Sequence, residues 1–205
     1  MKTAIIIFPG SNCDNEMERF LHKFSGVKPI LVWHKETTVP DVDLYVIPGG
    51  FSYGDYLRVG ALAKLSPIMK EIKRVAKEGQ KILGVCNGFQ VLCEAGMLPG
   101  TLRINRTQEF ICKPVTIRQA GSTFLIPIAH SEGNYYHPNP RKVKVAYTYT
   151  EDINGSINNI AGVYNDNVLG MMPHPERAVF PHHTNGDGIL IFVSALRKWA
   201  SNDRL

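Results

Sequence analysis

The chain has 205 residues, of which 44% are hydrophobic and 20% charged, and a formal net charge of +5. This length and composition allow one substantial core and argue against two independent domains, so we expect a single domain over residues 1–205. No apolar run approaches the roughly 20 residues of a membrane span, and the basic residues are scattered, which argues against membrane and nucleic-acid binding.

The N-terminal segment, MKTAIIIFPG, lacks the charged and apolar regions of a secretion signal. Four cysteines without such a signal are expected to be reduced thiols, and we expect a cytoplasmic protein. No C-x-x-C or H-x-x-H spacing is present, so the sequence predicts no metal site.

The N-terminal half alternates between short apolar runs and amphipathic runs. Because buried strands read as apolar runs and helices as stripes, these patterns predict strands separated by helices. Ser66 and Pro67 are the predicted helix cap and first helical residue, and Gly79 the stop. The predicted elements are strands over 3–8, 28–33, 44–47 and 81–85, a helix from about Asp14, and a helix from 66 to 79.

The pattern changes after Leu98, where strands follow one another through short turns. The expected strands cover 111–117, 124–129, 143–149, 160–164 and 168–172, and a final helix over 186–200 should turn Ile189, Phe192, Val193 and Leu196 inward. The expected fold is therefore a single α/β domain. Its central sheet should be mostly parallel, with helices on both faces and antiparallel additions in the C-terminal half.

The most informative local pattern is Gly84-Val-Cys86-Asn-Gly88, between a predicted buried strand and a predicted helix. A G-x-nucleophile-x-G sequence at such a turn predicts an elbow that holds its central side chain at the carboxyl edge of the sheet. The helix N-terminus there favours a thiolate. Cys86 is therefore a candidate nucleophile, the alternative being a buried structural cysteine.

The other cysteines have no such context. Cys93 and Cys112 are expected in the core, and Cys13, after the first strand, in a turn that could face the same edge.

A thiolate nucleophile needs a histidine base and a group that orients it. Two His-x-acid pairs follow apolar strands, His174-Pro-Glu176 and His130-Ser-Glu132, and in extended chain both side chains of a pair point the same way. Pro175 favours extended backbone at His174, yet the residues alone leave both pairs open. The two histidines at 182–183 are expected in a solvated loop.

An oxyanion hole requires two N–H donors. The N–H of Asn87 follows the nucleophile, and Gly49 and Gly50 follow the strand over 44–47, where glycines allow close backbone approach to a ligand. A simple tight turn is the alternative for the two glycines.

Five motifs together resemble the class I (triad) glutamine amidotransferases, and more narrowly the glutaminase-subunit family of phosphoribosylformylglycinamidine synthases. They are FPGSNCD (8–14), GGFSYGDY (49–56), GVCNGFQ (84–90), PIAH (127–130) and GMMPHPER (170–177). The resemblance implies a flavodoxin-like α/β fold. It also implies that Cys86 attacks glutamine, His174 protonates the departing ammonia and Glu176 orients His174.

The same resemblance implies Gly50 and Asn87 as oxyanion donors and Gln90, His130 and Ser131 as glutamine contacts. It also assigns the segment at His130 to the lining of the glutamine site instead of to the base. Ser131 stands where related chains have glycine. If that position requires a positive φ, serine would alter the local backbone.

The sequence contains no G-x-x-x-x-G-K-[ST] or other phosphate-binding stretch long enough for a synthetase. We therefore expect no cofactor in this chain, with ATP and Mg²⁺ bound by a partner. The resemblance implies two partners, a synthetase subunit and a small bridging subunit. The remaining alternatives are another amidotransferase or cysteine hydrolase, and a catalytically silent scaffold that binds a synthetase.

Overall fold

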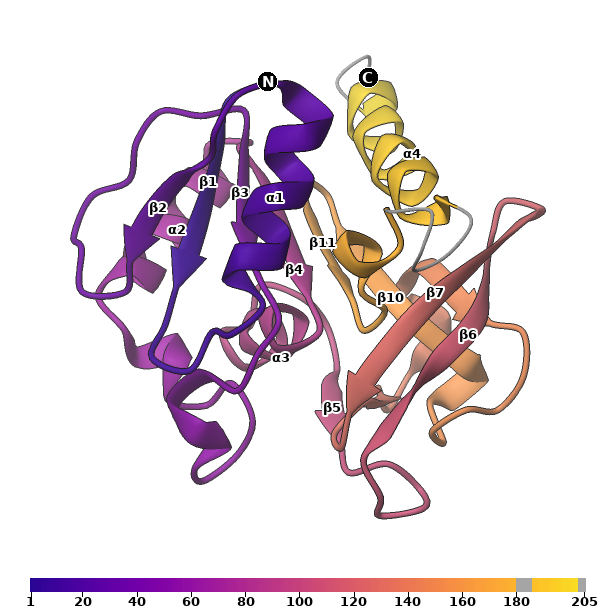
Figure 1. Cartoon of the computed structure of the whole chain (residues 1–205). Coiled ribbons are helices and arrows are strands. Elements are labelled where there is room, and N and C mark those ends of the chain that lie inside the picture. The colour runs from indigo at the N-terminus through magenta and orange to yellow at the C-terminus, as the bar shows by residue number, and fades with distance from the viewer. Residues whose placement is uncertain (180–185, 203–205) are drawn as a thin grey trace.

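A nine-stranded mixed sheet runs through the computed structural model, which describes residues 1–179 and 186–202 (Figure 1). Its strands are β1 (Thr3–Ile7), β2 (Ile30–Trp33), β3 (Leu44–Ile47), β4 (Lys81–Val85), β6 (Ile111–Gln119), β7 (Ser122–His130), β9 (Lys144–Tyr149), β10 (Ile160–Asn165) and β11 (Val168–Met171). They lie in the order β2-β1-β3-β4-β11-β10-β9-β6-β7.

The first five strands in this order are mutually parallel, and the remaining pairings are antiparallel. The predicted mostly parallel centre with antiparallel additions is confirmed for β6, β7, β9 and β10. The prediction that the strand over 168–172 is an antiparallel addition is wrong for one of its two pairings: β11 pairs antiparallel with β10 but parallel with β4. The short turn between β10 and β11 reverses the chain, so β11 re-enters the sheet in the direction of β4.

In the described part of the chain, four α-helices cover the sheet: α1 (Asp14–Ser25), α2 (Ile68–Lys77), α3 (Asn87–Glu94) and α4 (Asp187–Asn202). Helices α1 and α4 lie side by side on the face towards the viewer, with α2 and α3 behind it (Figure 1). The rings of Phe20 and Phe192 meet edge to face at 5.0 Å between α1 and α4. The prediction of helices on both faces is therefore confirmed.

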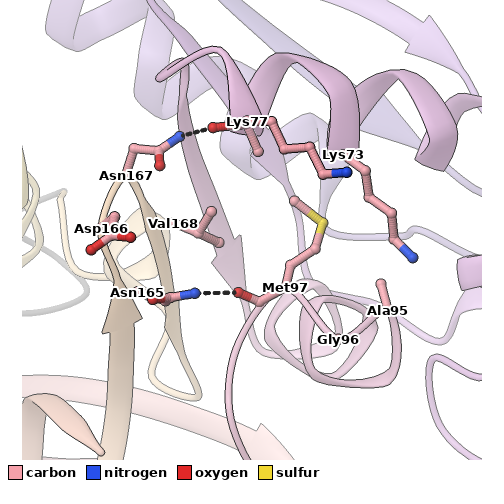
Figure 2. A pocket seen from close by; sticks show the side chains of 10 residues that line it. Lys73, Lys77, Ala95, Gly96, Met97, Asn165, Asp166, Asn167 and Val168 are labelled. Atoms are coloured by element: carbon pink, nitrogen blue, oxygen red, sulfur yellow. Dashed lines mark hydrogen bonds between the residues drawn. The ribbon is translucent and has the colours of Figure 1, made fainter.

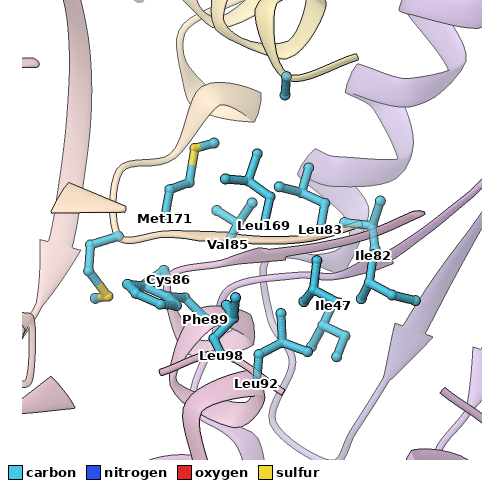
Figure 3. Close-up of a cluster of buried hydrophobic side chains, with 14 of the residues drawn as sticks. Ile47, Ile82, Leu83, Val85, Cys86, Phe89, Leu92, Leu98, Leu169 and Met171 are labelled. Carbon is cyan, nitrogen blue, oxygen red and sulfur yellow. The ribbon is translucent and has the colours of Figure 1, made fainter. Parts of the chain in front are cut away.

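The core beneath the elbow has two layers, separated by the sheet (Figure 3). Leu83 and Leu169 point from β4 and β11 to the side of α1 and α4, whereas Phe89 and Leu92 of α3 pack on the other side. All four are buried. The strand and helix that flank Cys86 are thereby fixed on both sides.

Two helix predictions need correction. Pro67 has helical dihedral angles (φ −50°, ψ −43°), but the Ser66 hydroxyl does not cap α2; it lies 2.8 Å from the Tyr53 hydroxyl. In α4 the predicted Phe192 is buried, and the predicted Ile189 and Leu196 are half-buried and pack against the core. The prediction is incomplete, because Val193 is only half-buried, while Ile191, Ala195 and Trp199 are buried and were not predicted. Because α4 packs against both β7 and α1, its inward face is wider than the predicted stripe.

The sequence prediction missed a small second sheet, in which β5 (Thr101–Arg103) pairs antiparallel with β8 (Asn134–Tyr136). Strands of three residues are too short to show an alternating pattern. Short 3₁₀ turns complete the described structure: η1 (Ser52–Asp55), η2 (Ala63–Leu65), η3 (Pro140–Lys142), η4 (Ile157–Asn159) and η5 (Pro175–Arg177). None of the described helices has the length and apolar character required to span a membrane. The two histidines predicted in a loop at 182–183 lie outside the described residues.

Candidate active site

Cys86 sits at the turn between β4 and α3 with φ +50° and ψ −107°, a conformation that is costly for any residue with a side chain. Its own N–H donates to the Met171 carbonyl of β11 at 2.7 Å. This backbone is the elbow that the spacing of the flanking glycines predicts.

The flanking glycines are required because the elbow brings three backbone segments together. A Cβ atom at Gly88 would collide with the carbonyl oxygen of Ile47 in β3, and one at Gly84 would lie 2.7 Å from the carbonyl carbon of Gly88. Real Cβ atoms do not approach backbone that closely. The glycines therefore let α3 lie directly against β3 and β4.

A cavity of about 230 Å³ opens beside the Cys86 thiol. Cys86 Sγ donates to the carbonyl of Ala129 at 3.6 Å across it. The residues that line it are Asn12, Cys13, Gly50, Phe51, Cys86, Phe110, Cys112, Ala129, His174 and Arg177. The structure thus brings the predicted nucleophile, the predicted base and one predicted oxyanion donor to a single cavity.

His174 follows β11, and both its ring and its backbone are held in place. Its Nδ1 lies 2.5 Å from Oε1 of Glu176, and the two side chains are 1% and 0% exposed. Its backbone N–H donates to the Pro127 carbonyl at 2.9 Å. Gly49 faces the ring, because a Cβ atom there would lie 2.7 Å from Cε1.

The way His174 and Glu176 meet differs from the sequence prediction. His174 is extended (φ −101°, ψ 89°), but Pro175–Arg177 forms the single 3₁₀ turn η5 instead of continuing the extended chain. Proline fits the first position of such a turn because its φ is fixed and it has no N–H to lose. The turn folds Glu176 back onto Nδ1 of His174.

Two opposing effects set the charge of His174. Burial alone would lower the pKa of its imidazole, but the Glu176 carboxylate and then the Cys86 thiol raise the pKa above the usual value. The Nε2 nitrogen is buried and is not engaged by Glu176. With Nδ1 held by Glu176, Nε2 is the nitrogen that is free to exchange a proton.

His130, the rival base, pairs with another residue. Its Nδ1 lies 3.1 Å from Oδ1 of Asn105, whose Nδ2 donates to the His130 carbonyl at 2.8 Å. Burial, and then the nearby His174, lower the pKa of His130 to about 4. Glu132 contributes its backbone carbonyl to Gln90 Nε2 at 2.7 Å, so no His130–Glu132 pair forms.

Of the two predicted oxyanion donors, Gly50 lines the cavity and Asn87 directly follows Cys86 in the chain. Gly50 lines the cavity with φ +136°, where a Cβ atom would lie 2.7 Å from the Asn12 nitrogen. Asn87 starts α3, and its side-chain Oδ1 accepts the N–H of Ser52 at 3.2 Å. The Asn87 side chain therefore ties the segment after β3 to the elbow.

The predicted glutamine contacts, Gln90, His130 and Ser131, do not line this cavity. The Gln90 amide is engaged by Asn87 Nδ2 at 3.1 Å as well as by the Glu132 carbonyl. Ser131 is not among the described residues with positive φ, and its carbonyl accepts the N–H of Asn105 at 2.8 Å, so serine fits this backbone. Their contact with glutamine stays a prediction.

Sequence reasoning did not single out Arg177 and left Cys13 in a turn. Both line the cavity, and Arg177 donates to Cys13 Sγ at 3.1 Å. Burial raises the pKa of Cys13 to about 12, although Arg177 opposes the shift. Cys93 is buried as expected, whereas Cys112 is exposed, contrary to the prediction, because it lies where β6 passes the mouth of the cavity.

A second cavity, of about 440 Å³, lies away from Cys86 between α2 and the turn before β11 (Figure 2). Lys73, Lys77 and Asn165 are among its lining residues, and Asn165 Nδ2 donates to the Met97 carbonyl at 3.4 Å. None of the predicted site residues lines it.

Comparison with known proteins gives strong matches. A family model described as a CobB/CobQ-like glutamine amidotransferase domain matches residues 1–189. Three curated relatives are described as phosphoribosylformylglycinamidine synthase subunit PurQ. That of Bartonella henselae is 43% identical and that of Zymomonas mobilis 45%, with 96% and 98% of this chain and 98% and 100% of the relative covered. That of Rhizobium etli is 46% identical over 96% of this chain and 98% of the relative.

Two solved structures are also similar to this chain. One chain in the structure of PurLQS from Thermotoga maritima has a TM-score of 0.90 and 40% identity, with 96% of this chain and 98% of that chain covered. A glutamine amidotransferase from Thermotoga maritima has a TM-score of 0.62 at 14% identity, covering 100% of this chain and 86% of that chain, which shows a common fold only.

Proposed function

The chain belongs to the CobB/CobQ-like glutamine amidotransferase family, and we propose that it is the glutaminase subunit of phosphoribosylformylglycinamidine synthase. It hydrolyses glutamine to glutamate and ammonia. A partner synthetase uses the ammonia, with ATP, to convert formylglycinamide ribonucleotide to formylglycinamidine ribonucleotide in de novo purine biosynthesis. The observation that carries this proposal is the Cys86 thiol at an elbow, facing the same cavity as the buried His174–Glu176 pair.

In the first half-reaction, the Cys86 sulfur attacks the side-chain carboxamide carbon of glutamine. His174 holds the proton of the Cys86–His174 pair at Nε2, because Nδ1 is held by Glu176, and the sulfur attacks as the thiolate. The tetrahedral oxyanion forms near the backbone N–H groups of Gly50 and Asn87. The C–N bond then breaks, the amine receives the proton from His174, and ammonia leaves a γ-glutamyl thioester on Cys86.

In the second half-reaction, water attacks the thioester. His174 removes a proton from that water and returns it to the sulfur of Cys86, which leaves as the C–S bond breaks. Glutamate is released. Glu176 stabilises the imidazolium form of His174 in both halves, since its carboxylate is one of the groups that raise the pKa of the ring.

The expected partners catalyse the ATP-dependent part of the reaction, which this chain does not carry out. Exchange of an amide oxygen for nitrogen requires ATP, and this sequence has no phosphate-binding motif of the P-loop type. We propose that ATP and Mg²⁺ bind to the synthetase subunit and that a small bridging subunit completes the complex. We also propose a cytoplasmic location, supported by four cysteines that are free thiols in the structure.

The test is glutamine hydrolysis and amidine formation by the complex of this chain with the synthetase and bridging subunits. Cys86→Ser should lower both rates by at least ~10³-fold, the scale for loss of a covalent nucleophile. It should leave amidine formation from added ammonium intact. Cys112→Ser, at the mouth of the same cavity, is the matched control and should retain activity.

Two outcomes would favour other functions. Equal rates for wild type and Cys86→Ser, with no Cys86 adduct from diazo-oxo-norleucine, would support a silent scaffold. Glutamine hydrolysis that supports a different synthetase but not this one would support another amidotransferase.

A further inference from the structure

A thiol that the mechanism does not use lies against the catalytic pair. One donor atom each from Cys13, His174 and Glu176 lies within 4.8 Å of the other two, and all three residues are buried. Cys13 comes from the turn after β1, and the other two follow β11. Gly49 faces both, because a Cβ atom there would lie 3.2 Å from Cys13 Sγ and 2.7 Å from His174 Cε1. The missing side chain lets thiol and imidazole lie together.

The donor set is one that zinc prefers. Thiolate, imidazole and carboxylate bind Zn²⁺ at about 2.3, 2.0 and 2.1 Å, so two of these ligands on a tetrahedral ion lie about 3.3–3.6 Å apart. The imidazole and the carboxylate lie 2.5 Å apart, and one donor atom of each of the three residues lies within 4.8 Å of the other two. Small side-chain rotations would bring all three donors to an ion.

The cluster also has unused donor capacity. Oε2 of Glu176 is buried and has no hydrogen-bond partner among the described residues. Buried polar atoms are nearly always paired, so an orphaned carboxylate oxygen beside a thiol indicates a place where a cation would be stabilised. The 230 Å³ cavity, lined by Cys13 and His174, provides the route of entry.

We propose that Cys13, His174 and Glu176 form a binding site for a zinc ion that inhibits the enzyme. The ion would occupy the base and its orienting carboxylate, so that His174 could no longer exchange a proton with Cys86. Arg177 would give up its contact with Cys13 Sγ and keep its 2.9 Å bond to Glu16. Mg²⁺ and Ca²⁺ would not compete, because they select oxygen ligands.

This ion is a regulator and not a cofactor of the reaction. The absence of metal-ligand spacing in the sequence is no objection, because the ligands stand 161 residues apart and only the fold joins them. Metal binding is independent of the proposed function, whereas the inhibition rests on it.

Binding is tested on the full chain with Co²⁺, which replaces Zn²⁺ and reports thiolate ligation by a charge-transfer absorption band. The band is expected in wild type and in Cys86→Ser, and Zn²⁺ should abolish it by displacement. Cys13→Ser should lose it, and Cys112→Ser, at the rim of the same cavity, should keep it. No band in wild type, or a band that survives in Cys13→Ser, would overturn the site.

Circular dichroism shows whether Cys13→Ser is folded. A measurement that needs no change at Cys13 is X-ray absorption on zinc-loaded Cys86→Ser, where one sulfur at about 2.3 Å from the zinc is expected. A zinc shell without sulfur would contradict the assignment.

Inhibition is tested by glutamine hydrolysis in the assembled complex at fixed Mg²⁺, relative to each variant's own rate without zinc. Cys13→Ser should raise the zinc concentration for half-inhibition by at least about 10–100-fold, because loss of a direct ligand should cost no less than loss of a group that supports a ligand. Cys112→Ser should leave the zinc concentration for half-inhibition unchanged, and a chelator should restore the activity of the zinc-inhibited enzyme. A cobalt band with no glutaminase activity under any condition would reject the proposed function and retain the site; equal inhibition of wild type and Cys13→Ser would reject the inhibitory role.

Discussion

Nδ1 of His174 lies 2.5 Å from Oε1 of Glu176, and neither side chain is accessible to solvent beyond 1%. A buried carboxylate this close to an imidazole favours the imidazolium, although burial itself opposes it. The pair therefore fixes both the orientation of the ring and the stability of its charged form. Several consequences can be measured.

Replacement of Glu176 by glutamine should change how stability depends on pH. In wild type the folded pKa of His174 is above its usual 6.5, so the folded state keeps a proton that the unfolded state loses. The corresponding stability is fully present below pH 6.5 and is lost as the pH rises through the raised pKa. Glu176→Gln removes the main group that raises it, so this alkaline loss should be smaller. Urea unfolding at several pH values above 6.5 measures the slopes, and identical slopes would contradict the prediction.

His130 should make the free energy of unfolding depend on pH in the opposite direction. Its folded pKa of about 4 lies below the usual 6.5, so between these values the unfolded state binds the extra proton. Stability should fall as the pH decreases from 6.5 towards 4, and His130→Gln should reduce that fall. Nuclear magnetic resonance titration of the His130 ring gives a direct check: the ring should be neutral at pH 6, and a charged ring there would refute the assignment.

Gly88→Ala should damage the elbow, because the added methyl group would collide with the Ile47 carbonyl. Overpacking of this kind costs about 1–3 kcal/mol, and displacement of Cys86 by an ångström could lower kcat by about 10²-fold. Gly96→Ala is the control. It adds the same group where nothing lies within 4 Å, at φ +70°, and should cost only about 1–2 kcal/mol with little loss of activity. Denaturant unfolding measures the stability of both variants, and glutamine hydrolysis measures their activity. Equal losses of activity in Gly88→Ala and Gly96→Ala would argue against the collision.

Asn87→Ala should impair the oxyanion hole without removing the backbone N–H of residue 87. The substitution leaves the Ser52 N–H without its buried acceptor and releases the segment that carries Gly50. Loss of one oxyanion donor costs about 10²–10³-fold, so displacement of Gly50 should lower kcat by about 10–100-fold with a smaller change in KM. Asn165→Ala, which removes an exposed amide at the distant cavity (Figure 2), should leave both constants unchanged. An effect on KM alone would assign Asn87 to substrate binding.

The residues around Cys86 could be predicted from the sequence because an elbow is a local requirement. A strand, two glycines and a helix start within seven residues dictate the turn, and the observed φ of +50° at Cys86 agrees. The same applies to the parallel strands β1, β3 and β4, which are short apolar runs between helical patterns.

Properties that depend on contact between distant segments were not predictable in the same way. The direction of β11, the buried face of α4 and the exposure of Cys112 depend on neighbours far away in the chain. The two His-x-acid pairs are equivalent as local patterns. They differ because Asn105 engages one histidine, while η5 turns Glu176 onto the other.

The sequence by itself determined the α/β class, the elbow and the identity of the nucleophile candidate, because backbone sterics and hydrophobic periodicity act over a few residues. Only the tertiary structure decided which acid meets His174 and placed the Cys13 thiol against that pair. Those relationships join the turn after β1 to the turn after β11, and the packing of the parallel sheet brings these two turns to one edge.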